Sequence, residues 1–246
     1  MATFVLIHGA GDVGWYWHLL EAELRSRGHD VVAPDLPCDD DTAGLADYAD
    51  AVVAAVGDRS DLVVVGQSYG GFTAPLVADR LPVDLLVLLA AMIPSPGETP
   101  EDWWTHTGYK QAAQEQAERD GGQTGNDDPL VAYYNGVPRP LAEEVQRRSR
   151  DESTTAYRTP WPLDAWPEVP TKFVLCQDAT SSRPTSCAAL PRSAWASART
   201  RSPAATAWPS AIPRSWPTGW WPTSASDVRT DGDPRPPQVH RSPGPS

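Results

Sequence analysis

The residues of this sequence whose types and spacing best fit a chemical role are Gly66-Gln67-Ser68-Tyr69-Gly70, a G-x-S-x-G pattern. An apolar run, Asp61–Val65, precedes the pattern, and apolar residues at helical spacing follow it, which predicts a strand, a tight turn and a helix. A serine on such a turn projects its hydroxyl from the end of a sheet, and the flanking glycines leave the backbone room. We therefore predict that Ser68 is a nucleophile and that the N–H of Tyr69 points at a developing oxyanion. An ordinary glycine-rich turn is the alternative.

Three other stretches accompany this turn. Phe4–Gly11 reads FVLIHGAG, Gly14–Trp17 reads GWYW, and Trp161–Trp166 reads WPLDAW. With these residues the chain resembles the α/β-hydrolase fold, and within it the small esterase branch that includes plant methylesterases and hydroxynitrile lyases. The resemblance covers residues 1 to about 178.

The resemblance implies roles for individual residues. It implies that Ala10 supplies the second oxyanion N–H, and that His8 shapes the loop rather than acting as the catalytic base. The family's triad acid follows the strand Thr171–Cys176, which implies Asp178; a surface aspartate is the alternative there. No cofactor and no metal are implied, and the expected substrate is a small-molecule ester. The candidate substrate-binding residues are Gly9, Gln67, Trp103 and Trp104.

Apolar runs alternate with helical patterns at the spacing of a doubly wound, mostly parallel α/β sheet. The sequence becomes polar and helix-rich from Pro94 to about residue 160, where the resemblance implies a helical cap over the serine. We therefore predict an α/β-hydrolase body over residues 1–178 with a cap at about 94–160. The expected strands are Thr3–Ile7, His29–Leu36, Asp61–Val65, Val83–Ala91 and Thr171–Cys176, and the expected helices before the cap are Trp15–Arg27, Leu45–Val56 and the helix after the turn.

Aromatic residues of the predicted cap would wall an apolar pocket above the serine. The alternative, that the rings attach the cap to the body, applies to about half of them. These residues are Trp103, Trp104, Tyr109, Tyr133 and Tyr134.

The net charge of −12 is unevenly distributed. Residues 179–246 hold eight arginines and three aspartates and carry +5, so residues 1–178 carry −17. An acidic body argues against nucleic-acid binding, and the arginines of the tail form no cluster. Three cysteines show no disulfide or metal spacing. The chain starts in a strand and holds no apolar run near 18 residues, so we expect a cytoplasmic protein that does not enter a membrane; its oligomeric state stays open.

The composition changes at residue 179. Of the 68 residues from there to the end, 50 are Ala, Ser, Pro, Arg or Thr, and twelve are proline, which predicts a disordered tail. Five tryptophans do not suit such a tail. The third base of each codon can be read together with the first two bases of the next codon. In that frame the codons of residues 180–184 can encode VFPA, those of residues 199–210 can encode DEIPGGHCVAL, and those of residues 211–222 can encode HPAELADRLVA. We therefore predict that the tail is frameshifted; a genuine low-complexity tail is the alternative.

A frameshift would remove the triad histidine, which the family keeps after two glycines. The histidines present are His8, His18, His29, His106 and His240. We expect a serine esterase lineage whose activity is impaired in this chain. A hydroxynitrile-lyase-like enzyme using Lys110, and a non-catalytic ligand-binding or truncated product, are the alternatives.

Overall fold

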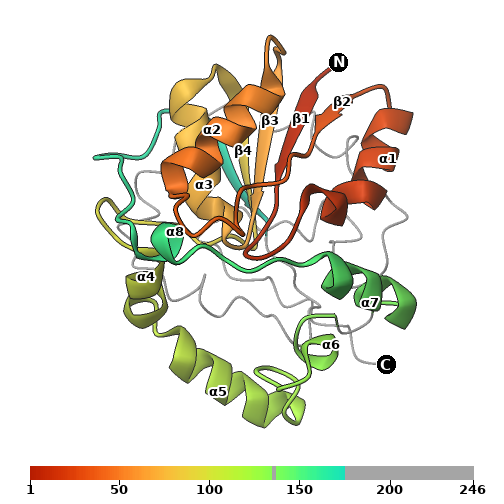
Figure 1. The fold of residues 1–246 in the computed structure, drawn as a ribbon, viewed down its shortest axis with the longest axis vertical. Coiled ribbons are helices and arrows are strands. Elements are labelled where there is room, and N and C mark those ends of the chain that lie inside the picture. The colour runs from red at the N-terminus through yellow and green to blue at the C-terminus, as the bar shows by residue number, and fades with distance from the viewer. Residues whose placement is uncertain (135–136, 175–246) are drawn as a thin grey trace, which may run out of the picture.

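The computed structural model describes residues 1–134 and 137–174, and Figure 1 shows how their helices and strands are arranged. The described strands form one sheet in the order β2-β1-β3-β4-β5, and every neighbouring pair is parallel. The strand order reverses between β1 and β3. In open parallel sheets such a point opens a crevice at the carboxyl ends of the strands. The strands are β1 (Thr3–Ile7), β2 (Asp30–Val32), β3 (Leu62–Gln67), β4 (Val83–Leu89) and β5 (Thr171–Val174).

Alternate side chains of each strand enter two separate hydrophobic cores, because successive residues of a strand point to opposite faces. Val5, Val64 and Leu86 lie in the core that faces α2 and α3. Phe4 and Val63 lie in the other core, with side chains of the first helix. The strands therefore read as continuous apolar runs, as expected of a sheet covered on both faces.

The helices before the helical insertion lie on both faces of the sheet (Figure 1). α2 and α3 pack beside each other on one face, and α1 lies on the other. A single turn of 3-10 helix, Gly14–Trp17, leads into α1. These helices are α1 (His18–Ser26), α2 (Leu45–Val56) and α3 (Gly70–Arg80).

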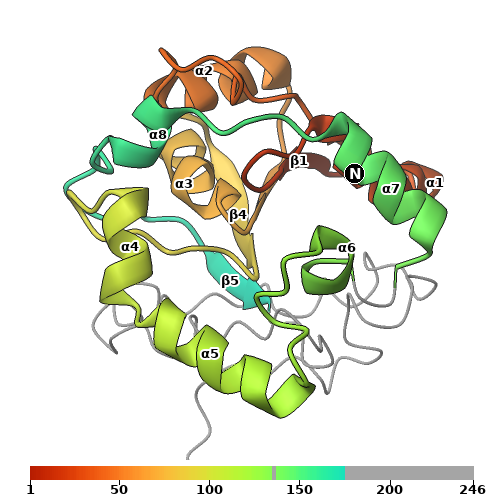
Figure 2. The same ribbon diagram turned by 60° about the horizontal axis from the view of Figure 1, so that its bottom comes forward.

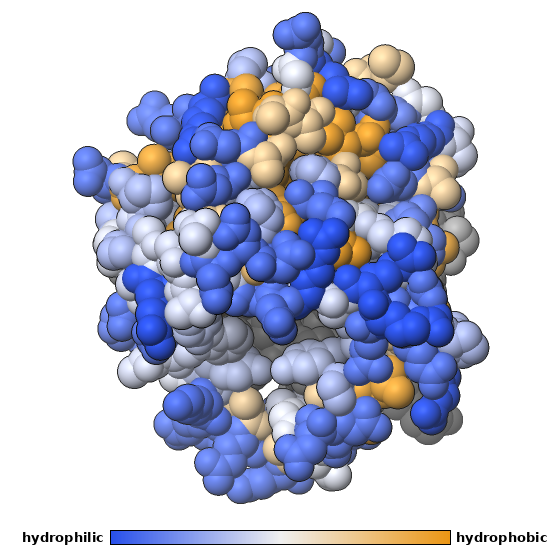
Figure 3. Space-filling view, in the orientation of Figure 1, coloured by the Kyte–Doolittle hydropathy of each residue, from blue (hydrophilic) through white to orange (hydrophobic). Residues whose placement is uncertain are grey.

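The helices between β4 and β5 gather beyond the carboxyl ends of the strands, and Figure 2 brings them forward. Most residues of α5 are polar or charged, and the lower part of the surface in Figure 3 is mostly hydrophilic. No helix in the described part of the chain is long and apolar enough to cross a membrane. The helices are α4 (Pro100–His106), α5 (Tyr109–Asp120), α6 (Pro129–Ala132), α7 (Arg139–Arg148) and α8 (Thr154–Arg158).

The predicted doubly wound parallel sheet is confirmed, and several element boundaries differ from the sequence prediction. β3 runs from Leu62 to Gln67 instead of over Asp61–Val65, and β4 ends at Leu89 instead of Ala91. The strand expected over His29–Leu36 is reduced to β2; Pro34, just beyond its end, has no N–H to donate, and the N–H of Leu36 donates to the ring of His8. The helix expected from Trp15 begins as the 3-10 turn. The division into body, cap and tail stays a prediction, and the tail lies outside the described residues.

Candidate active site

Ser68 lies at the turn between β3 and α3, where the G-x-S-x-G pattern places it. Its φ is +50°, in the left-handed region that residues with a Cβ seldom adopt. The neighbouring chain fixes this conformation. The carbonyl oxygen of Ser68 accepts the N–H of Met92 at 2.8 Å and that of Gly71 at 3.1 Å. Strain of this kind costs on the order of 1–3 kcal/mol and persists at functional sites where the surroundings enforce it.

The turn is tight because its glycines lie directly against other backbone. A Cβ on Gly66 would lie 2.7 Å from the carbonyl oxygen of Gly70, and a Cβ on Gly70 would lie 2.7 Å from that of His8. A side chain at either position would therefore separate elements that now touch. As a result, α3 begins against the loop that follows β1.

The loop after β1 lies beside Ser68. A Cβ on Gly9 would lie 3.2 Å from the Cβ of Ser68 and 2.6 Å from Oε1 of Gln67. Among the described residues, neither the N–H of Ala10 nor the N–H of Tyr69 has a hydrogen-bond partner. Tyr69 is also the N-cap residue of α3, where the helix dipole favours negative charge. Two free N–H groups on the segments that meet at a serine are what an oxyanion hole requires.

His8 is buried and hydrogen-bonded through both ring nitrogens. Nε2 accepts the N–H of Leu36 at 3.1 Å, so Nδ1 carries the proton and donates to the carbonyl of Gly9 at 2.8 Å. Burial lowers the pKa of His8, although the Gly9 carbonyl and the charge of Asp35 act in the other direction. His8 is thus a neutral side chain that holds the loop, and its lone pair is occupied.

The other described histidines are bonded elsewhere as well. No histidine in residues 1–134 or 137–174 hydrogen-bonds to the hydroxyl of Ser68. Asp178 and His240 lie outside the described residues, so the role of Asp178 as the triad acid stays a prediction. Nδ1 of His18, His29 and His106 hydrogen-bonds to the carbonyl of Trp15, the N–H of Ala2 and the carboxylate of Glu98, respectively.

A sequence profile of the alpha/beta hydrolase family matches residues 4–241. The chain belongs to the alpha/beta hydrolase family.

Its curated relatives include norfluorocurarine synthase 2 of Strychnos sp, 35% identical over 109 residues, and the probable esterase PIR7A of Oryza sativa subsp. indica, 38% identical over 109 residues. Each alignment covers 39% of this chain and 41% of the relative, so the chain spans about two fifths of the length of these relatives. A solved extracellular alpha/beta-hydrolase from a Paenibacillus species is 21% identical, with a TM-score of 0.57 over 77% of this chain and 86% of that one. That likeness shows the fold.

In this alpha/beta hydrolase, two acidic residues that the sequence analysis did not single out lie at the loop after β1. Glu152 accepts the N–H of Gly11 at 2.8 Å and the hydroxyl of Tyr48 at 2.7 Å. The half-buried carboxylate of Asp12 has no hydrogen-bond or ion-pair partner among the described residues. Burial, and then the charge of Glu152, raise the pKa of Asp12 to about 7.

The sequence offers a signal for only one of these two acids. Glu152 lies 141 residues from Gly11 in a polar stretch, so no local pattern could have indicated it. Asp12 follows the predicted oxyanion loop directly, and this position was the available signal. The described residues contain no group of three or more His, Cys, Asp or Glu side chains that could hold a metal ion.

The two predicted substrate-binding tryptophans lie in different surroundings on α4. Trp103 is buried in the core, and its indole N–H donates to the carbonyl of Ile93 at 3.1 Å. Trp104 is half-buried, with its ring edge-on to those of Trp103 and Tyr109. Trp103 therefore attaches α4 to the body. A substrate contact stays a prediction for both tryptophans and for Gly9 and Gln67.

Proposed function

We propose that this chain carries the site of a serine esterase that acts on small carboxylic esters. The observation that carries the proposal is the left-handed Ser68 beside the two unpartnered N–H groups of Ala10 and Tyr69. The 38% identity to a probable esterase over 109 residues supports it.

The proposed reaction follows from these groups. The hydroxyl oxygen of Ser68 attacks the ester carbonyl carbon, and the serine proton passes to a histidine base that Asp178 orients. The N–H groups of Ala10 and Tyr69 hold the oxyanion of the tetrahedral intermediate. The alcohol then leaves with the proton, and water attacks the acyl-enzyme to release the acid. This reaction requires no metal or cofactor.

We further propose that hydrolysis is impaired in the chain as written, because its triad histidine has been lost to a frameshift after residue 178. The proposal is supported by the four described histidines, none of which hydrogen-bonds to the hydroxyl of Ser68; His8 uses both ring nitrogens elsewhere, and Nδ1 of His18, His29 and His106 is bonded elsewhere. A cyanohydrin lyase is less well supported, since the side chain of Lys110 on α5 is exposed. A cytoplasmic location and the absence of a nucleic-acid partner stay predictions.

A fluorophosphonate probe tests the nucleophile directly, because the serine oxygen replaces fluoride on phosphorus to form a stable bond. We expect slow labelling of the wild-type chain at Ser68 and none of the Ser68→Ala variant, measured by intact mass and peptide mapping. Ser60→Ala is the matched control, because Ser60 is exposed and precedes the other end of β3. If Ser68→Ala is labelled as fast as the wild-type chain, Ser68 is not the nucleophile.

A further inference from the structure

The segment between α7 and α8, residues 149–153, crosses beneath the carboxyl ends of the strands (Figures 1 and 2). We call it the strap. Its end is anchored to the loop before α2, where the buried hydroxyl of Ser153 donates to the carbonyl of Ala43 at 2.7 Å. The N–H of the next residue, Thr154, donates to a carboxylate oxygen of Asp41 at 3.0 Å. The strap is therefore held by the body as well as by α7.

The strap binds both polar groups of Gly11. The N–H of Arg150 donates to the carbonyl of Gly11 at 2.7 Å, and the N–H of Gly11 donates to Oε2 of Glu152 at 2.8 Å. Gly11 has a φ of +65°, and a Cβ there would lie 2.7 Å from the carbonyl oxygen of Arg150. The close fit depends on glycine, so the strap and the loop after β1 are matched in shape.

These bonds fix the peptide planes on both sides of Ala10. The plane that contains the N–H of Ala10 also contains the carbonyl of Gly9, which accepts the proton of His8. The next plane contains the N–H of Gly11, which Glu152 holds. Each peptide group is planar, so the bond from His8 to the Gly9 carbonyl orients the N–H of Ala10 directly. The bond from Gly11 to Glu152 holds the next plane and limits rotation about the φ and ψ of Ala10, which join the two planes. Gly9 and Gly11 are thus restrained, while the N–H of Ala10 stays free for a ligand.

Glu152 is itself held by the body. Its second carboxylate oxygen accepts the hydroxyl of Tyr48, a fully buried residue of α2, at 2.7 Å. The charged groups around it do not compete for its oxygens, since the guanidinium of Arg150 binds Asp35 at 2.8 Å and also reaches Asp39. The carboxylate therefore links α2 to the loop that carries the N–H of Ala10.

We propose that Glu152 is a positioning residue that aims the N–H of Ala10 at the oxyanion by holding the adjacent Gly11 peptide. The inference rests on the proposed esterase site. Glu152 acts through the length of its side chain and its ability to accept a hydrogen bond. Its negative charge does not contribute, because a carboxylate and the oxyanion repel each other.

Replacements of Glu152 separate the effect of side-chain length from the effect of charge. Glu152→Gln keeps the length, because its amide oxygen can accept the N–H of Gly11 while its NH2 group faces the oxygen of Tyr48. Glu152→Asp keeps the charge but is one methylene shorter, and Glu152→Ala removes both. For each variant, the concentration dependence of fluorophosphonate labelling gives a binding constant, KI, and a bond-forming rate, kinact.

We expect Glu152→Gln to label at nearly the wild-type rate, and Glu152→Asp and Glu152→Ala to lose about tenfold or more in kinact with KI unchanged, since a misplaced oxyanion donor weakens transition-state binding alone. A charge role would reverse the order, with Asp faster than Gln, and would overturn the proposal. Equal kinact for all variants would also overturn it. Glu152→Asp and Glu152→Gln keep the test valid if Glu152→Ala does not fold.

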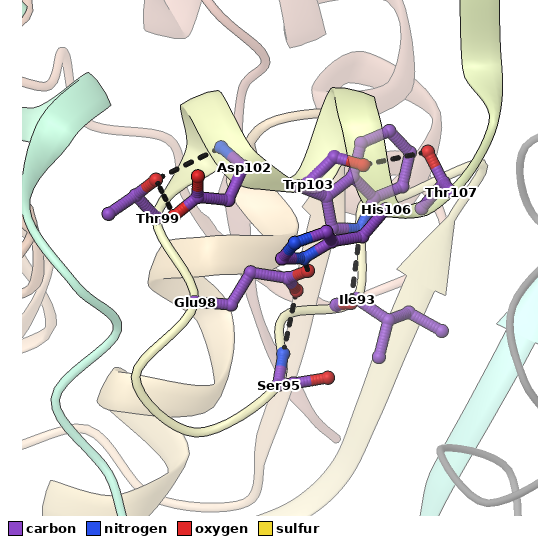
Figure 4. A network of polar contacts seen from close by, with 8 residues as sticks. All are labelled: Ile93, Ser95, Glu98, Thr99, Asp102, Trp103, His106 and Thr107. Carbon is purple, nitrogen blue, oxygen red and sulfur yellow. Dashed lines mark hydrogen bonds and ion pairs between the residues drawn. The ribbon is translucent and has the colours of Figure 1, made fainter.

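Glu98 provides a matched control for lost stability. Its carboxylate likewise accepts one backbone N–H, that of Ser95 at 3.0 Å, and pairs with one side chain, that of His106 (Figure 4). The side chain of Glu98 is 9% exposed. Glu98→Ala should lower Tm about as much as Glu152→Ala while leaving kinact within about twofold. An equal fall of kinact in both variants would reduce Glu152 to a structural residue. Failure of the wild-type chain to label at Ser68 at all would refute the esterase site itself, and with it this inference.

Discussion

The surroundings of Asp12 stabilise its ionised carboxylate poorly. Its carboxylate is half-buried, has no hydrogen-bond partner in the described part of the chain, and lies within electrostatic reach of Glu152. It also lies near Tyr134, whose pKa burial and Asp12 raise to about 12. Asp12 therefore sits between the body and the chain that joins α6 to α7. Its pKa of about 7 compares with an ordinary value of 3.8.

This shift predicts a pH dependence of stability. The folded protein binds the Asp12 proton more tightly than the unfolded chain does, so the contribution of Asp12 to folding is complete below about pH 4 and is lost as the pH rises through about 7. The full loss corresponds to about 4 kcal/mol in the free energy of unfolding at 1.36 kcal/mol per pH unit. Asp12→Asn removes this charge and should raise Tm more at pH 8 than at pH 5.

Thermal unfolding followed by circular dichroism at the two pH values checks this expectation. Asp127→Asn, at an exposed carboxylate, is the control and should change Tm little at either pH. A Tm difference for Asp12→Asn that does not vary with pH would contradict the predicted ionisation.

The sequence could predict the residues that a short motif places together, and not those that the fold brings together. The predicted roles of Ser68 and Tyr69 follow from the G-x-S-x-G pattern, and that of Ala10 follows from the family resemblance alone. Glu152 and Tyr48 are separated by 104 positions along the chain, and nothing in either local sequence marks a bond between them. Their bond matters because it is sheltered from water, and that burial depends on the packing of elements that are distant in the sequence.

At the level of elements, β3 and α3 position Ser68 by close contact. A Cβ on Gly66 would lie 2.7 Å from the carbonyl oxygen of Gly70 and 2.8 Å from the Cβ of Ala74, so the helix could not stay where it is. Gly66→Ala should lower the free energy of unfolding by about 1–3 kcal/mol, the usual cost of overpacking, and should slow fluorophosphonate labelling because the turn at Ser68 shifts.

Gly44→Ala is the control for this substitution. Gly44 precedes α2, and a Cβ there would meet its nearest neighbour at 3.8 Å, an ordinary contact distance. Because Gly44 is the N-cap residue of α2 and alanine is a poorer N-cap, the Tm of this variant should fall by a small amount, and its labelling rate should stay near the wild-type value. If Gly66→Ala unfolds and labels like Gly44→Ala, the contact between strand and helix does not position the serine.

The elements themselves were predictable to the extent that periodicity and burial agree. α2 matches its expected range, Leu45–Val56, because its buried residues recur at helical spacing and a glycine lies at each end of the helix. β2 does not match: it ends at Val32, two residues before Pro34, which has no N–H, and the N–H of Leu36 donates to a ring nitrogen of His8. A side chain that bonds to backbone across 28 positions leaves no periodic trace in the sequence.

At the scale of the whole molecule, the site is incomplete in the part of the chain that the structure describes. A serine at a tight turn, the two N–H groups that we propose as oxyanion donors and a braced loop are present, and none of the four described histidines bonds to that serine. If the chain lacks a general base, as we propose, the hydroxyl of Ser68 stays protonated. Loss of one triad member typically costs about 10⁴ to 10⁶ in turnover. The chain as written should therefore hydrolyse esters slowly.

Restoring the alternative reading frame from codon 179 tests this account, and the DNA sequence there shows which frame the gene contains. The restored tail reads VFPA and then GGHCVAL, which supplies a histidine after two glycines. Turnover of a short-chain nitrophenyl ester by the restored protein should exceed that of the original chain by at least about 10³.

Replacing the recovered histidine with alanine should return turnover to the slow level, while Ser68→Ala should abolish it in both proteins. If the original chain already matches the restored one, a histidine among the five it contains acts as the base, and the explanation by a lost triad member is wrong.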